Sequence, residues 1–63
     1  MIINVEAKDY EDELKTMSIV ELKKFGVRLS NRYEEPEINS WTVRREIQEM
    51  IMKEVELRRN RNE

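Results

Sequence analysis

The pattern of apolar positions predicts two main helices. Over residues 18–34, apolar side chains recur at the three- and four-residue spacing of one helix face, and these are Leu22, Phe25, Leu29 and Tyr33. A longer run with the same period covers residues 40–60, with Val43, Ile47, Met50 and Ile51 on its apolar face. The only proline, Pro36, lies in the intervening segment "EEPEINS" and disfavours a helical conformation for the residue before it. We therefore expect an all-α fold, an antiparallel hairpin of helices 18–34 and 40–60.

Local signals place the helix ends. Ser18 and Glu21 have the S-x-x-E spacing of a capping box, which marks the start of the first helix. Asn39 or Ser40 can cap the second helix. Inside the first helix, Gly26 is about 1 kcal/mol less favourable than alanine, so we expect another backbone to cross close to it.

The N-terminal segment is expected to pack on the hairpin. Ile3 and Val5 alternate with polar residues, so residues 1–9 are an arm containing either a short strand or an extended segment. Asp9 can cap a following helical turn. We treat residues 1–63 as one small domain, and its predicted core consists of Leu14, Met17, Leu22, Phe25, Leu29, Tyr33, Val43, Ile47, Met50 and Ile51.

The size of the chain favours a second subunit. Domains of 63 residues bury a small core and often depend on disulfides, a metal ion or oligomerisation. The chain contains neither cysteine nor histidine, which argues against a disulfide framework and a zinc site. The apolar face of residues 40–60 is also wider than one partner helix requires. We therefore expect a homodimer.

Charge and motifs argue against an enzyme. Charged residues make up 41% of the chain and the net charge is −2, with acids gathered in residues 9–13 and in the loop at Glu34, Glu35 and Glu37. No phosphate-binding loop or calcium-binding spacing is present. We expect no catalytic residue, cofactor, metal or small-molecule substrate. No apolar run reaches the length of a signal peptide or membrane span, so we expect a cytoplasmic protein without membrane contact.

Trp41, the only tryptophan, admits two interpretations. It lies at the start of the second helix, next to Ile38. One interpretation is a lid in which Trp41 and Ile38 close the open end of the hairpin near Leu29 or Tyr33. The other is an anchor in an interface, where tryptophan is enriched among the residues that dominate binding.

Two families share this layout. The order of strand, helix, loop and helix, with "INSWTVRREIQEMI" (38–51) opening the second helix, resembles the ribbon-helix-helix repressors, which are DNA-binding dimers. This resemblance implies phosphate contacts from Asn39 or Ser40 and from Arg44 and Arg45. The strand carries Glu6, which would repel phosphates, so nucleic acid is the less favoured partner. Residues 17–61 also resemble a family of small ribosomal proteins shaped as a helical hairpin.

These observations favour a small non-enzymatic regulator or inhibitor that binds another protein, of the kind found in bacteria and phages. Its acids at Glu34, Glu35 and Glu37 would address a basic surface, and its apolar contacts would come from Trp41, Met52 and Val55. The alternative is a DNA-binding transcriptional repressor of the ribbon-helix-helix type. A weaker third option is a structural subunit of a larger assembly.

Overall fold

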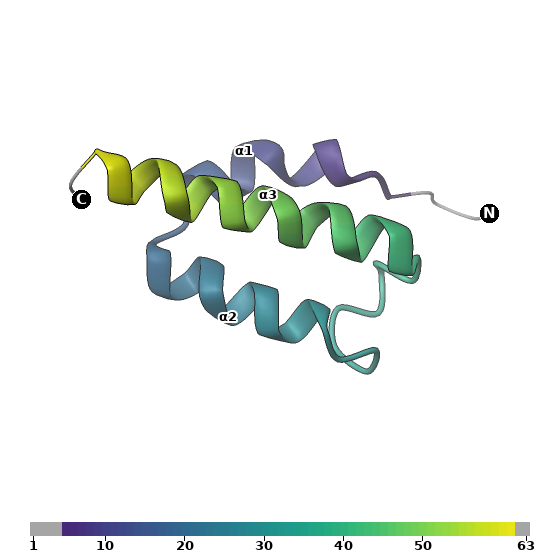
Figure 1. Cartoon of the computed structure of the whole chain (residues 1–63). Coiled ribbons are helices and arrows are strands. Elements are labelled where there is room, and N and C mark those ends of the chain that lie inside the picture. The colour runs from purple at the N-terminus through teal and green to yellow at the C-terminus, as the bar shows by residue number, and fades with distance from the viewer. Residues whose placement is uncertain (1–4, 62–63) are drawn as a thin grey trace.

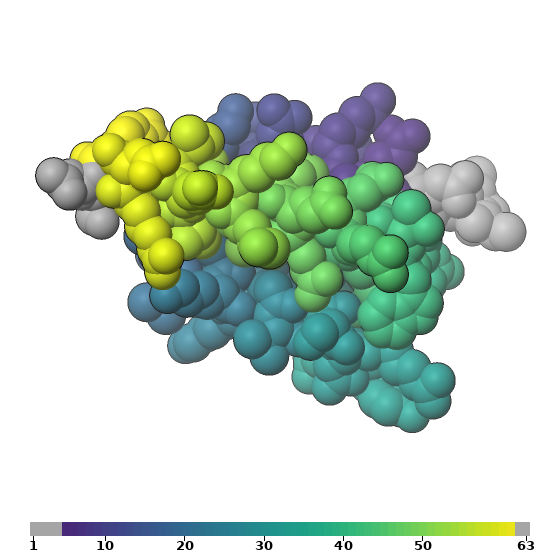
Figure 2. Space-filling view, in the orientation of Figure 1, coloured from purple at the N-terminus to yellow at the C-terminus, as the bar shows by residue number. Residues whose placement is uncertain are grey.

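The computed structural model describes residues 5–61 and is all-α. A 3₁₀ turn η1 (Ala7–Tyr10) leads into α1 (Glu11–Thr16), which is followed by α2 (Ile19–Leu29) and α3 (Trp41–Asn60). The long helix α3 contacts η1 and α1 as well as α2 (Figure 1). In the space-filling view, α3 lies between the η1–α1 segment and α2 (Figure 2).

The expected N-terminal strand falls mostly on residues that the structure does not describe. Residues 1–4 lie outside the described range, and Val5 and Glu6 belong to neither a strand nor a helix. Ala7 already begins η1 and its side chain is buried. Within residues 5–61 the arm is therefore a helical turn packed on α3.

The predicted capping box of α2 is confirmed. Ser18 Oγ accepts a hydrogen bond from the Glu21 N–H at 3.1 Å, and Glu21 Oε1 accepts one from the Ser18 N–H at 3.0 Å. For α3, Ser40 rather than Asn39 is the cap, since its Oγ accepts from the Val43 N–H at 3.4 Å. The cap expected from Asp9 for the following helix is wrong: Tyr10 is the cap residue of α1, and Asp9 lies within η1, where its Oδ2 accepts from the Glu6 N–H at 3.0 Å.

The first helix ends five residues earlier than the expected 18–34, because polar side chains bond to its backbone. Ser30 Oγ donates to the Val27 carbonyl at 2.6 Å, and Asn31 Oδ1 accepts from the Tyr33 N–H at 3.0 Å. Such local bonds compete with the helical ones and favour turns. Tyr33 therefore leaves the helix face and is 78% exposed, so its predicted place in the core is wrong.

Most of the remaining predicted core is observed. The buried apolar residues are Ala7, Leu14, Leu22, Phe25, Leu29, Ile38, Ile47 and Ile51, and Met17, Val43 and Met50 pack against them while partly exposed. Ile38, which is 1% exposed, belongs to the buried core although it was not among the predicted core residues.

Gly26 is not explained by a crossing backbone. A Cβ atom built on Gly26 would have Ile51 Cδ1 as its nearest neighbour, at 3.9 Å, which is an ordinary van der Waals distance. Its carbonyl accepts from Gln48 Nε2 at 3.0 Å, a bond that any residue could form. The expectation of a close backbone approach is wrong, and the fold itself does not require glycine here.

Candidate protein-binding surfaces

The loop between α2 and α3 is fixed by one buried arginine, Arg44. This side chain is 3% exposed, and its guanidinium group donates only to backbone carbonyls. Nε donates to Ile38 at 2.6 Å, Nη1 to Leu29 at 2.9 Å and Asn31 at 3.1 Å, and Nη2 to Glu34 at 2.5 Å and Glu35 at 2.9 Å. A guanidinium has five N–H donors, so the five carbonyls match its full capacity. The positive charge also lies at the negative end of the α2 dipole.

The other candidate phosphate contacts are spread over the same helix start. A role for Arg44 in contacting phosphate is at odds with its interior position. Arg45 and Asn39 are exposed, whereas Ser40 is half-buried and engaged as the α3 cap. No strand is found within residues 5–61.

A second buried arginine, Arg58, closes the turn between α1 and α2. It is 9% exposed, and its Nη2 donates to the carbonyls of Leu14 at 3.1 Å and Lys15 at 3.0 Å, while Nη1 donates to that of Met17. Its Nε pairs with Glu54 Oε2 at 2.9 Å. Arg44 and Arg58 are fourteen residues apart, about four helical turns, so both lie on the side of α3 that faces the rest of the chain.

Trp41 stands above this fixed loop and is exposed. More than half of its side chain, 56%, is accessible to solvent, and the Arg44 guanidinium carbon lies 5.4 Å from its ring centroid. Cation–π contacts of this kind attract a guanidinium to the face of an aromatic ring. The lid interpretation fails, because Ile38 closes the core without Trp41. We name the surface formed by Tyr33, Glu34, Glu35, Glu37 and Trp41 the loop end.

Two carboxylates of the loop end interact with neighbouring groups. Glu35 has a positive φ of 52°, and its Oε1 accepts from Arg28 Nε at 3.1 Å. Hydrogen bonding, first to its own backbone N–H and then with the neighbouring Glu35 carboxyl, lowers the pKa of Glu37. Within the described part of the chain, no group of acids is arranged to hold a metal ion.

The acids of η1 and α1 add to the negative charge around the loop. The pKa of Tyr10 is raised, first by burial and then by the charges of Glu37, Glu13, Glu35 and Asp9. Acids from two segments far apart in sequence therefore act on one phenol.

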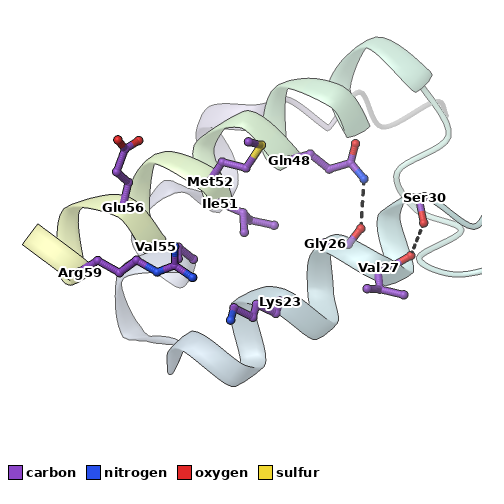
Figure 3. A pocket seen from close by; sticks show the side chains of 10 residues that line it. All are labelled: Lys23, Gly26, Val27, Ser30, Gln48, Ile51, Met52, Val55, Glu56 and Arg59. Carbon is purple, nitrogen blue, oxygen red and sulfur yellow. Dashed lines mark hydrogen bonds between the residues drawn. The ribbon is translucent and has the colours of Figure 1, made fainter. Parts of the chain in front are cut away.

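The second surface is an apolar groove between α2 and α3, with a volume of about 830 Å³ (Figure 3). We name it the α2–α3 groove, and its lining residues are Lys23, Gly26, Val27, Ser30, Gln48, Ile51, Met52, Val55, Glu56 and Arg59. Met52 is 69% exposed and Val55 is half-buried. The sequence predicted Met52 and Val55 as apolar contacts for a partner, and it did not predict the residues on the α2 side of the groove.

The predicted partner-binding residues therefore divide between two places. Trp41 and the three glutamates belong to the loop end, whereas Met52 and Val55 line the groove. Trp41 and Met52 are eleven residues apart on one helix, about 16 Å along its axis. One small partner element would not be expected to contact both closely.

Comparisons with known proteins found no match. No protein-family model, curated protein or solved structure matches this chain. None of the helices within residues 5–61 combines the length and apolar character needed to cross a bilayer.

Proposed function

We propose that this chain is a small non-enzymatic regulator that binds another protein through its loop end. The observation that carries this proposal is Trp41, an exposed aromatic ring in cation–π contact with Arg44. The same arginine donates hydrogen bonds to the carbonyls of the loop before Trp41. Exposed tryptophan on a fixed backbone is the kind of residue that dominates binding energy at protein interfaces.

Rigidity is what makes the loop end suitable for binding. An irregular segment that orders on binding loses conformational freedom, and this weakens the complex. Here the loop conformation is already set by Arg44 and by the Arg28–Glu35 ion pair at 3.1 Å. The antiparallel hairpin that we infer for α2 and α3 would supply the frame on which this loop is presented.

The partner implied by this chemistry has a basic surface with an apolar recess. Trp41 and Tyr33 would fill the recess, and Glu34 and Glu37 would face the basic groups. The acids near Tyr10 extend the same negative region and would steer a basic partner during approach. Inhibition would follow if that basic surface normally binds something else.

The test is capture of the partner from the source cells with matched variants. Trp41→Ala and the charge reversal Glu34→Lys/Glu37→Lys should each reduce the amount of captured partner at least about tenfold, as expected for a binding hot spot. Leu57→Ala is the matched control, because Leu57 lies on the same helix and is 55% exposed. If both loop-end variants capture the partner as well as the control does, the proposal is wrong.

The DNA-binding alternative makes a different prediction in the same preparation. A protein with six phosphate contacts should lose about 10³-fold in affinity for a mixed-sequence duplex between 50 and 200 mM salt. We expect no salt-sensitive binding, since Arg44 is buried and the loop end is acidic. Binding that is lost on Arg45→Ala and weakens steeply with salt would favour the repressor instead.

A further inference from the structure

We infer that the α2–α3 groove binds a second copy of this chain, and that the two copies are related by a two-fold axis that runs along the groove. This surface is separate from the loop end, so the inference does not depend on the proposed function. It concerns apolar side chains that the fold leaves uncovered.

The groove is uncovered because η1 and α1 pack elsewhere on α3. The η1–α1 segment and α2 lie on different sides of α3 (Figures 1 and 2), and Val27, Met52 and Val55 remain accessible between α2 and α3. A domain with so few buried apolar residues gains most from covering such a face with another subunit. A specific dimer buries about 800 Å² on each partner, roughly a sixth of the 5127 Å² that this chain exposes. The interface must therefore use the groove and both of its edges.

The groove contains both a projecting side chain and a hollow, at similar positions along its length. Met52 projects from the α3 side, while the α2 side lacks a side chain at Gly26, which lies beside Ile51 (Figure 3). A two-fold axis along the groove places the α2 side of one copy opposite the α3 side of the other. Each residue keeps its position along the length of the groove. Met52 of each copy then faces the Gly26 hollow of the other. This accounts for a glycine that the isolated fold does not require.

The charges along the groove fit the same symmetry. Lys23 is the charged residue that lines the α2 side, and Glu56 and Arg59 line the α3 side at the same end (Figure 3). The two-fold axis brings Lys23 of one copy to the α3 side of the other, next to Glu56. Glu56 is the acid that lines the groove, so the charge contact between the two copies depends on it.

Sedimentation velocity tests the dimer directly. The wild-type protein should pass from monomer to dimer between about 5 and about 500 µM, as for a dimer with a Kd of about 50 µM. Met52→Lys should remain monomeric over this concentration range, because it places a charged side chain in the apolar α2–α3 groove. Leu57→Lys is the matched control on the same helix and should dimerise like the wild type, since Leu57 does not line the groove.

Gly26→Ala separates an interface role from a folding role. Its added methyl group fits the isolated fold and improves helix propensity, so the Tm of the dilute monomer should rise. The same methyl group fills the seat of Met52, so the dimer affinity should fall about fivefold. A glycine kept only for folding would show a lower monomer Tm, which would contradict this inference.

Charge reversal tests the geometry. Glu56→Lys gathers like charges at one end of the interface and should weaken the dimer, most strongly at low salt. Glu46→Lys makes the same change in net charge on α3 outside the groove and should not. A wild-type protein that stays monomeric to about 500 µM, or a dimer that survives Met52→Lys, overturns the inference. Neither result affects the partner-capture experiment with Trp41→Ala, which tests the loop end alone.

Discussion

Within residues 5–61, the connections that flank α2 are each closed by a buried arginine of α3, but in different ways. At the short turn between α1 and α2, Arg58 combines three carbonyl bonds with a carboxylate partner, Glu54. At the long loop between α2 and α3, Arg44 uses all of its donors on carbonyls. Irregular backbone leaves more carbonyls without helical partners, and buried carbonyls need donors. The longer loop therefore depends more heavily on its arginine.

This comparison predicts the largest effect for Arg44→Ala. Removing the side chain leaves five carbonyls without their donor, and the free energy of unfolding should fall by about 3–5 kcal/mol. That loss is close to the whole stability of a domain of this size, so the variant should be largely unfolded at room temperature. Urea titration followed by circular dichroism measures it.

The neighbouring Arg45→Ala is the control for Arg44, since Arg45 is exposed. It should change the unfolding free energy by less than about 0.5 kcal/mol. Arg44→Lys should be nearly as damaging as alanine, because one ammonium group cannot reach carbonyls spread from Leu29 to Ile38. A loss below about 1 kcal/mol for Arg44→Ala would show that the loop does not depend on this side chain.

A smaller effect is expected at the short turn. Arg58→Ala should lower the unfolding free energy by about 2 kcal/mol, because the turn exposes fewer carbonyls and lies near the end of α3. Arg59→Ala, one position along and exposed, is the matched control. Trp41 gives a local readout, because it contacts Arg44 at the other connection: its fluorescence in the folded protein should be unchanged by Arg58→Ala. A shift in the Trp41 fluorescence of folded Arg58→Ala would mean that the two connections are not independent.

The same comparison explains which parts of the fold were predictable. The start of α2 followed from Ser18 and Glu21, because a capping box is local and needs only four residues. The apolar stripes at Leu22, Phe25 and Ile47 followed from periodicity. The end of α2 did not, because Ser30 and Asn31 can stand in a helix or end it, and periodicity alone carried the prediction on to Tyr33.

The buried arginines and the division of the site were harder to foresee. A hydrophobic pattern counts Arg44 and Arg58 as surface residues, although both fall in register with Ile47 and Ile51 on the inner side of α3. Their burial depends on carbonyls supplied by distant segments, which no local signal reports. Trp41 and Met52 were grouped by residue type, whereas the structure separates them along the helix.

The smallest predicted effect sharpens the contrast between the two main helix starts. The cap of α2 includes a reciprocal carboxylate, Glu21, whereas α3 has Val43 at the equivalent position and no such group. Hydrogen bonds from the Ser18 N–H and hydroxyl lower the pKa of Glu21 below its ordinary value of 4.5. A carboxyl with a lowered folded-state pKa contributes stability above its unfolded pKa, and this contribution disappears as the pH falls through the folded value.

Urea midpoints should therefore decline below pH 4.5, and Glu21→Gln should make that decline shallower. Glu49→Gln removes one carboxylate from an exposed position of α3 and controls for net charge. Equal slopes for Glu21→Gln and the wild type would mean that the cap does not sense protonation, and that the two helix starts differ in sequence but not in acid response.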